Sequence, residues 1–297
     1  MSTGKGSIDR VSLLAGLAWI SPWLVGVLGF FAAPVAISIY YSFTDYSMIE
    51  APVSVGLDNY REMLTDGLVH TAARNTLLFA AMNAGGSTVL ALALALLLNK
   101  PFAGRGAVRA IIFVPTLVPA VSAAVTWLWL LNPKFGLFNG VLSAIGVSGP
   151  DWLGDRAFAL PSLAIMSCWV IGSPSLVSAA ALRDVPRSLY EAADIDGVSA
   201  WGRFRNVTLP MISPALLFNV VMSMIWSLQL FAPPLIMTRG GPENSTYSFS
   251  MYVYSNAFVY GRMGYACALG WVQAVVTLAL AAVVLVAARR FVYYRAA

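Results

Sequence analysis

The stretch EAADIDGVSAWGRFRNVTLP, residues 191–210, contains charged residues and lies between two long apolar segments. Residues 157–182 precede it and residues 212–237 follow it, and neither segment contains Asp, Glu, Lys or Arg. Each segment is long enough for a helix to cross a bilayer, which takes about 20 apolar residues. The sequence therefore predicts that the chain leaves a membrane before residue 191 and enters it again after residue 210.

The whole chain has the composition of a membrane protein. It is 59% hydrophobic and 10% charged, whereas soluble domains are about 25% charged. Backbone polar groups in lipid need internal partners, and the alternation typical of barrel strands is absent, so the apolar windows are predicted as helices. The fold class is thus expected to be all-α, a polytopic membrane protein with six transmembrane helices. The six windows are residues 13–41, 76–98, 110–131, 157–182, 212–237 and 263–288.

The charges between the windows predict the orientation. Lys and Arg accumulate in cytoplasmic loops. If the N-terminus is inside, the inner segments hold twelve of the 18 basic residues, and the outer segments hold eight of the 13 acidic residues. We therefore expect both termini in the cytoplasm, and the net charge of +5 needs no nucleic acid partner to explain it. The first window exceeds the about 7–15 apolar residues of a secretory signal, so it is expected to remain as a span.

The chain is expected to divide after about residue 70. The first window and its outer loop form an appendage, and residues 71–297 form a five-helix core. Prolines inside the windows either shape packing or break helices to open a substrate cavity. Pro174, Pro233 and Pro234 are the strongest candidates for the second role, because polar or aromatic residues surround them. The full set is Pro22, Pro34, Pro115, Pro119, Pro161, Pro174, Pro214, Pro233 and Pro234.

Local signals give the charged stretch a helix–turn–helix form. Ser188 and Glu191 have the spacing of a capping box, which predicts the start of a short helix. Gly197 accepts the left-handed conformation that ends such a helix. Ser199 is then expected to cap a second short helix that ends near Pro210. The segment of about residues 183–210 is either an interfacial helix pair or a docking element for another protein.

The same stretch resembles the signature loop of ABC-importer permeases, written EAA, three residues, G, nine residues, I, one residue, LP. Val207 stands where the family carries isoleucine. The resemblance implies a type I ABC importer permease fold and a separate ATPase that docks here, with Tyr190 and Ala193 as apolar contacts and Arg203 and Arg205 among the charged ones. The residues assigned to ATPase coupling by this resemblance are Glu191, Ala192, Ala193, Gly197, Leu209 and Pro210.

A second segment, residues 238–269, resembles the GGP…ST…Y…AF…GYA pattern of sugar and glycerol-phosphate permeases. Residues 55–64, VGLDNYREML, are similar to the corresponding stretch of the carbohydrate-type branch. The resemblance implies a carbohydrate substrate, a second homologous permease, two ATPase copies and an external substrate-binding protein. The matched positions of the pattern are Gly240, Gly241, Pro242, Ser245, Thr246, Tyr254, Ala257, Phe258, Gly264, Tyr265 and Ala266.

Polar residues in the fifth window are candidate substrate contacts. Asn219, Ser223, Trp226 and Ser227, with Leu230, fall at helical spacings and share one face. Two interpretations are open: hydrogen bonds between helices, or a carbohydrate site in which hydroxyls bind the polar groups and the indole stacks on the sugar. Resemblance to maltose-type permeases favours the second.

The family resemblance implies that a similar cluster in the fourth window lines the same cavity. It consists of Trp169, Gly172 and Ser175, with Ser173 between them. Trp127 and Trp129, in the third window, are expected to anchor the chain at the membrane interface instead.

No chemistry of its own is expected from this chain. No Walker motif is present, so ATP and Mg²⁺ are expected on the partner ATPase. His70 stands alone, and Cys168 and Cys267 are expected to be free thiols, so neither a metal site nor a cofactor is predicted. Rival interpretations are a scaffold subunit whose partner permease holds the substrate and a stand-alone carrier. The fifth window lacks a cation, which favours a neutral oligosaccharide or disaccharide over glycerol 3-phosphate.

Overall fold

The computed structural model describes residues 10–290, 292 and 293. The ends that carry Lys5 and Arg295, on which part of the orientation argument depends, lie outside this range. Contacts divide the chain into two units, one of residues up to Met63 together with Asn256–Trp271, the other of Leu64–Ser255 and the residues from Val272 onward. The first boundary falls at residue 63, close to the predicted division, but residues 256–271 join the first unit.

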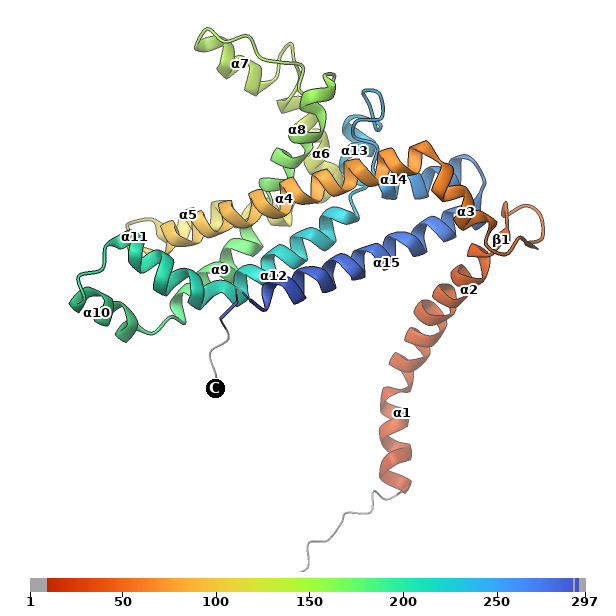
Figure 1. The fold of residues 1–297 in the computed structure, drawn as a ribbon, viewed down its shortest axis with the longest axis horizontal. Helices are drawn as coiled ribbons and strands as arrows, with labels where there is room; N and C mark the ends of the chain where they lie inside the picture. Colours follow the sequence, from red (N-terminus) through yellow and green to blue (C-terminus); the bar gives the residue numbers. More distant parts are fainter. Residues whose placement is uncertain (1–9, 291, 294–297) are drawn as a thin grey trace, which may run out of the picture. The chain divides into compact units, whose positions relative to one another are not determined.

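The first unit is built on one long apolar helix and a small hairpin. Helix α1 (Arg10–Val27), a π turn (Leu28–Ala32) and α2 (Ala33–Ser42) follow one another without a break (Figure 1). The antiparallel pair β1 (Thr44–Asp45) and β2 (Val53–Ser54) and helix α3 (Asp58–Thr65) come next.

Asn59, in the segment that resembles carbohydrate permeases, connects α3 to the end of α2 and to the start of the hairpin. Its amide donates to the carbonyl oxygens of Ser42 at 2.9 Å and Thr44 at 3.0 Å. The hairpin is therefore held by a buried side chain of α3.

The second unit contains the remaining spans, except that residues 263–271, at the start of the last span, belong to the first unit. Within the second unit, α4 is the helix with the most extensive packing. α4 packs against α12, α9, α8 and α14. Its buried alanines, among them Ala72, Ala91 and Ala95, allow neighbouring helices to approach closely. The helices are α4 (Gly67–Asn99), α5 (Arg105–Phe113), α6 (Ala120–Leu130), α7 (Leu137–Ala144), α8 (Arg156–Cys168), α9 (Gly172–Arg183), α10 (Arg187–Ile195), α11 (Ala200–Arg203), α12 (Leu209–Leu228), α13 (Ala232–Met237), α14 (Phe249–Tyr254) and α15 (Met263–Ala288).

All six apolar windows are helical, but two of them are bent. Four helices in the described residues are long and apolar enough to cross a membrane: Ala15–Ser42, Gly67–Asn99, Ala200–Leu228 and Met263–Ala288. Two bent pairs raise the number to six if each pair is one span. Arg105–Leu117 and Ala120–Leu130 meet at 105°, and Arg156–Cys168 and Gly172–Arg183 meet at 53°.

Prolines stand at the breaks. Pro119 is the N-cap of α6, Pro174 lies in the first turn of α9, and Pro233 and Pro234 lie in the first turn of α13. A proline is tolerated in a first helical turn, where the missing N–H has no helical partner in any case. The prediction of one continuous helix for the fifth window is therefore wrong. α12 ends at Leu228, and α13 follows as a separate short helix.

Gly172, at the bend between α8 and α9, allows a close approach between α9 and α5. A Cβ at this position would lie 2.7 Å from Cγ2 of Thr116 and 2.9 Å from both the carbonyl oxygen of Ile112 and Cα of Phe113. Two of these three atoms belong to backbone, which cannot move aside as a side chain tip can. The glycine thus lets α9 touch the end of α5 and the following 3-10 turn (Val114–Leu117).

Gly172→Ala is expected to destabilise the protein by about 1–3 kcal/mol, the usual cost of overpacking. The control is Gly106→Ala in α5, where a Cβ meets no atom within 4 Å and the change is expected to be neutral or stabilising. Thermal unfolding of the purified protein, followed by intrinsic fluorescence, measures both. Equal melting temperatures for Gly172→Ala and the parent chain would contradict the packing role.

Candidate functional site

The charged stretch folds as two short helices, but the first one begins without the predicted capping box. α10 starts at Arg187, its N-cap is Pro186, and no side chain caps it. Pro186 has φ −60° and ψ 132°, so the fixed proline ring already directs the chain into the helix one residue before Ser188. Gly197 has a φ of +66°, as predicted for the residue that ends this helix.

The second short helix runs directly into the fifth span. Ser199 caps α11 by accepting a hydrogen bond from the backbone N–H of Gly202 at 3.2 Å, as predicted. The predicted end near Pro210 is wrong, because a π turn (Phe204–Thr208) joins α11 to α12 without a break. Pro210 lies in the first turn of α12, directly after the widened turn, where its missing N–H is tolerated.

One face of α10 is fastened to the membrane-spanning helices. Ala193 is buried, and Tyr190 packs on the cluster formed by Leu182, Val185 and other residues of α4, α9 and α12. The Tyr190 hydroxyl also lies 2.9 Å from the hydroxyl of Thr208. These two residues were predicted as apolar contacts for a partner, and the structure places them against the chain itself. An Arg203–Asp194 ion pair further joins the two short helices.

The opposite face of α10 is open to solvent. Ser188, Glu191, Ala192 and Ile195 are exposed and lie three or four residues apart, so they form one face of the helix. Ile195 is 87% exposed, although it is a large apolar residue. Sequence reasoning missed Ile195, because it lies outside the EAA and G positions of the motif. An exposed isoleucine among charged residues is the one signal that could have identified it.

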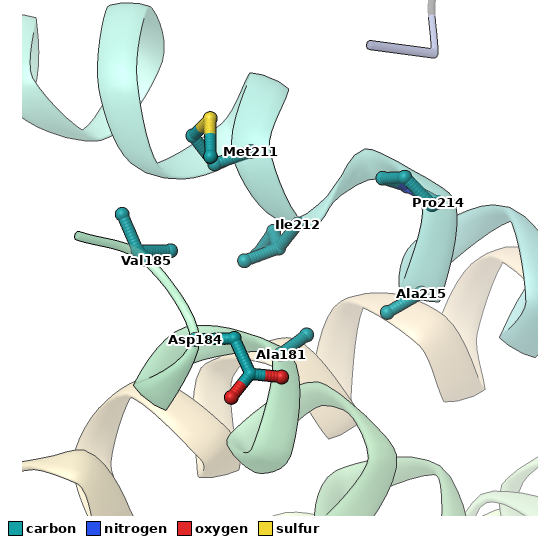
Figure 2. A pocket seen from close by; sticks show the side chains of 7 residues that line it. All are labelled: Ala181, Asp184, Val185, Met211, Ile212, Pro214 and Ala215. Atoms are coloured by element: carbon teal, nitrogen blue, oxygen red, sulfur yellow. The ribbon is translucent and has the colours of Figure 1, made fainter. Parts of the chain in front are cut away.

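A cavity of about 270 Å³ lies where α9 ends and α12 begins. Figure 2 shows Asp184 and Ala181 on one side of it and Met211, Ile212 and Pro214 on the other. Val185 and Ala215 complete the lining, so Asp184 supplies the only charged side chain. Such a lining offers neither a ligand set for a metal nor donors for a phosphate. Among the described residues, no group of three His, Cys, Asp or Glu side chains could hold a metal ion.

The polar residues predicted on the fifth span hold helices together. The amide of Asn219 donates to the carbonyl oxygen of Pro174 and to the hydroxyl of Ser178, both at 3.0 Å. Ser223 and Ser227 accept hydrogen bonds from Asn83 on α4. The contacts in this structure are thus the interhelical hydrogen bonds of the first interpretation, and Ser227 is only 2% exposed.

Trp226 lies outside this contact. It is 70% exposed, and Met222 and Phe218, one and two helical turns earlier, are exposed on the same side of α12, as is Gln229, the C-cap just beyond Leu228. We call this set of four residues the α12 outer stripe. The helix face predicted from the sequence is therefore divided. Ser227 and Asn219 face other helices of the unit, and Trp226 faces away from them. Leu230, the fifth member of the predicted face, lies beyond the end of the helix.

The cluster predicted in the fourth window is at the bend between α8 and α9. Trp169 packs edge-on to Trp127, with ring centroids 6.2 Å apart. Ser175 is buried and donates to the carbonyl oxygen of Ile171 at 2.7 Å. Trp127 is 7% exposed and belongs to the core, so its predicted place at the membrane interface is wrong. Trp129, at 56% exposed, remains available for that role.

The segment that carries the GGP motif is a loop tied to α4. The amide of Asn75 donates to the carbonyl oxygens of Asn244 and Tyr247, and the hydroxyl of Thr76 accepts from the N–H of Phe249 at 2.9 Å. Thr246 is fully buried, and its hydroxyl donates to the carbonyl oxygen of Gly241 at 2.8 Å. Sequence reasoning did not identify Asn75, because its partners are backbone atoms far along the chain.

Comparison with known proteins identifies the family. Residues 87–295 match the model of the binding-protein-dependent transport system inner membrane component. The chain belongs to this family. It is therefore a permease subunit of an ABC importer in the membrane and not an enzyme, because separate ATPase subunits carry out ATP hydrolysis in these systems.

Curated relatives agree with this assignment. The trehalose/maltose transport system permease protein MalF of Thermococcus litoralis is 36% identical over 251 residues, which cover 84% of each chain. The diacetylchitobiose uptake system permease protein NgcF of Streptomyces coelicolor is 36% identical and covers 94% of this chain and 83% of its own.

A solved structure shares the fold. It belongs to a bacterial ABC transporter that imports the acidic polysaccharide alginate, has a TM-score of 0.81 and is 25% identical. The alignment covers 96% of this chain and 98% of that one. A second structure of the alginate transporter contains a periplasmic protein bound to an alginate pentasaccharide. The likeness confirms the type I importer permease fold expected from the signature loop.

Gly197 offers a test of the turn between α10 and α11. Valine in a left-handed conformation costs about 1–2 kcal/mol, whereas asparagine tolerates it. Because a Cβ at this position meets no atom within 4 Å, the loss in Gly197→Val comes from backbone conformation alone. ATP-driven uptake, measured at matched membrane levels, is expected to fall in Gly197→Val and to be retained in Gly197→Asn. Equal uptake by the two variants would show that the turn does not need this conformation.

Proposed function

We propose that this permease moves a neutral carbohydrate across the cytoplasmic membrane, paired with a second homologous permease. One of two ATPase subunits docks on α10 from the cytoplasm, and an external binding protein delivers the substrate. Both termini are cytoplasmic in this arrangement. The relatives named for trehalose/maltose and diacetylchitobiose support the class of substrate.

The observation that carries the substrate proposal is the exposure of Trp226 on a span without charge. Pyranose rings present C–H faces that stack on indoles, and hydroxyls that bind amides such as that of Gln229. No Lys or Arg occurs between residues 206 and 238, so this face offers no charge to an anionic ligand. The predicted contacts Ser223, Ser227 and Asn219 then act behind Trp226, since their polar groups are engaged with other helices.

The coupling proposal depends on the two faces of α10. The buried face, with Ala193 and Tyr190, transmits force to α9 and α12. The open face, with Glu191, Ala192 and Ile195, meets the ATPase. Leu209 and Pro210 belong to the start of α12, where they receive the movement rather than contact the ATPase.

Two other functions are tested by the same experiments. A glycerol-3-phosphate-type permease would need a cation for the phosphate, and the α12 outer stripe has none. A scaffold subunit would leave the substrate to its partner permease. Ligand retained by the binding protein of the purified complex identifies the substrate class directly.

Ile195→Asp is expected to weaken retention of the ATPase subunits by at least about tenfold, the equivalent of about 1.4 kcal/mol. The residue is 87% exposed, so the change does not disturb packing within the chain. Ile195→Val keeps the apolar contact and serves as the control. The measurement is the amount of co-expressed ATPase that copurifies with the permease. Unchanged copurification in Ile195→Asp would overturn the docking role of this face.

Trp226→Ala is expected to raise the KM for carbohydrate uptake by about fivefold, because the loss of one aromatic stacking contact costs about 1 kcal/mol. Trp226→Phe should retain most of the affinity. The matched control is Trp129→Ala, since Trp129 is similarly exposed at 56% but lies on α6. Uptake of a radiolabelled disaccharide by the reconstituted complex provides the measurement. A KM that does not change in Trp226→Ala would assign the substrate contacts to the partner permease.

A further inference from the structure

We propose that Asn83, on α4, is a positioning residue for the substrate path: it fixes the rotation of α12 about its own axis and so aims Trp226 away from the helix bundle. The inference rests on the proposed substrate role of Trp226. Nothing in the signature motifs includes Asn83, which precedes the family match that begins at residue 87.

The composition of α12 does not by itself fix how the helix is rotated about its axis. The helix is apolar on nearly all sides, with little difference between its faces. A helix of this kind in lipid gains little from facing one way rather than another, because lipid tails and apolar side chains are equally suitable neighbours. Its rotation must therefore be set by polar contacts and by shape.

Polar side chains of α4 bind α12. Asn83 donates through Nδ2 to Ser227 Oγ at 2.8 Å and to Ser223 Oγ at 3.3 Å. Ser87, one turn along α4, lies 2.9 Å from the Ser223 hydroxyl. The four residues form a ladder, since each pair is spaced by one helical turn on its own helix. We call this set the α4–α12 ladder.

The α4–α12 ladder determines the direction in which Trp226 points. Successive residues of a helix differ by about 100° in direction. Trp226 directly precedes Ser227, so a contact that buries Ser227 against α4 turns Trp226 away from it, as its 70% exposure records. Asn219 is a second attachment, to α9, seven residues before Trp226. Gln273 on α15 is a third attachment, and it donates to the backbone carbonyl oxygen of Leu228 at 2.7 Å. Asn83 is the attachment that binds the side chain of the residue next to Trp226.

Burial explains why the ladder is sensitive to Asn83. The side chain is 9% exposed, and its Oδ1 has no hydrogen-bond partner among the described residues. Ser227 donates its own proton to the carbonyl oxygen of Ser223 at 2.6 Å, so it is held to α4 only as an acceptor. Removal of the Asn83 amide therefore leaves Ser227 without a hydrogen bond to α4.

The test measures the direction of position 226 without reference to substrate. Trp226→Cys is introduced in a background of Cys168→Ala and Cys267→Ala, and labelling by a membrane-impermeant maleimide is followed in the full complex. Asn83→Ala is expected to reduce the labelling rate about fivefold, the equivalent of about 1 kcal/mol for one interhelical contact. Asn75→Ala is the matched control, because Asn75 lies on the same helix with the same 9% exposure but binds loop backbone.

A rescue variant separates positioning from general stability. Asn83→Ser should behave like Asn83→Ala, whereas Asn83→Ser combined with Ser227→Asn moves the amide to α12 and should restore labelling. In the chain with Trp226 present, Asn83→Ala should raise the KM for uptake about fivefold while the maximal rate per assembled complex changes less.

The outcomes distinguish this inference from the proposed function. Equal labelling in Asn83→Ala and the parent, equal losses in Asn83→Ala and Asn75→Ala, or failure of the exchange variant to restore labelling would each overturn the positioning role. A labelling change together with an unchanged KM in Trp226→Ala would support the positioning role and reject Trp226 as a carbohydrate contact.

Discussion

The arrangement of the second unit depends on one constraint: polar groups within a bilayer must find partners inside the protein. α4 meets this constraint for several of its neighbours. Asn75 and Thr76 bind the loop that carries the GGP motif, and Asn83 and Ser87 bind α12. Between these polar positions, small buried residues such as Ala91 let the helices approach. Specific hydrogen bonds thus set which neighbour lies where, and close packing makes the contact tight.

The proposed coupling depends on how α10 is joined to α12. Tyr190 of α10 packs on the cluster at the ends of α9 and α12, and its hydroxyl binds that of Thr208 in the π turn before α12. α11 continues through a π turn into α12 with no flexible connection. In the proposed coupling, a force on the open face of α10 is transmitted through these contacts to α12, which carries Trp226. The cavity between α9 and α12 leaves room for these two helix ends to move relative to each other.

Sequence patterns predicted what local chemistry controls. The six apolar windows, the left-handed Gly197 and the Ser199 cap are each determined by a few neighbouring residues. The capping box at Ser188 was wrong, because Pro186 starts the helix first. Helical spacing correctly predicted that Ser227 and Trp226 lie near each other on α12. In the structure, however, Ser227 contacts α4 and Trp226 does not. That boundary is set by Asn83, about 140 residues away, and no local pattern contains it.

The exposure of the α12 outer stripe also bears on assembly. A solute path through a bilayer must be enclosed on all sides by protein, because lipid cannot solvate hydroxyls. Trp226 and Gln229 are exposed on the same side of α12, while the polar residues on its other side are already engaged. A face that offers such groups needs an opposing wall, and a second permease with a similar helix supplies one. The need for an opposing wall supports the proposed pair of permeases over a stand-alone carrier.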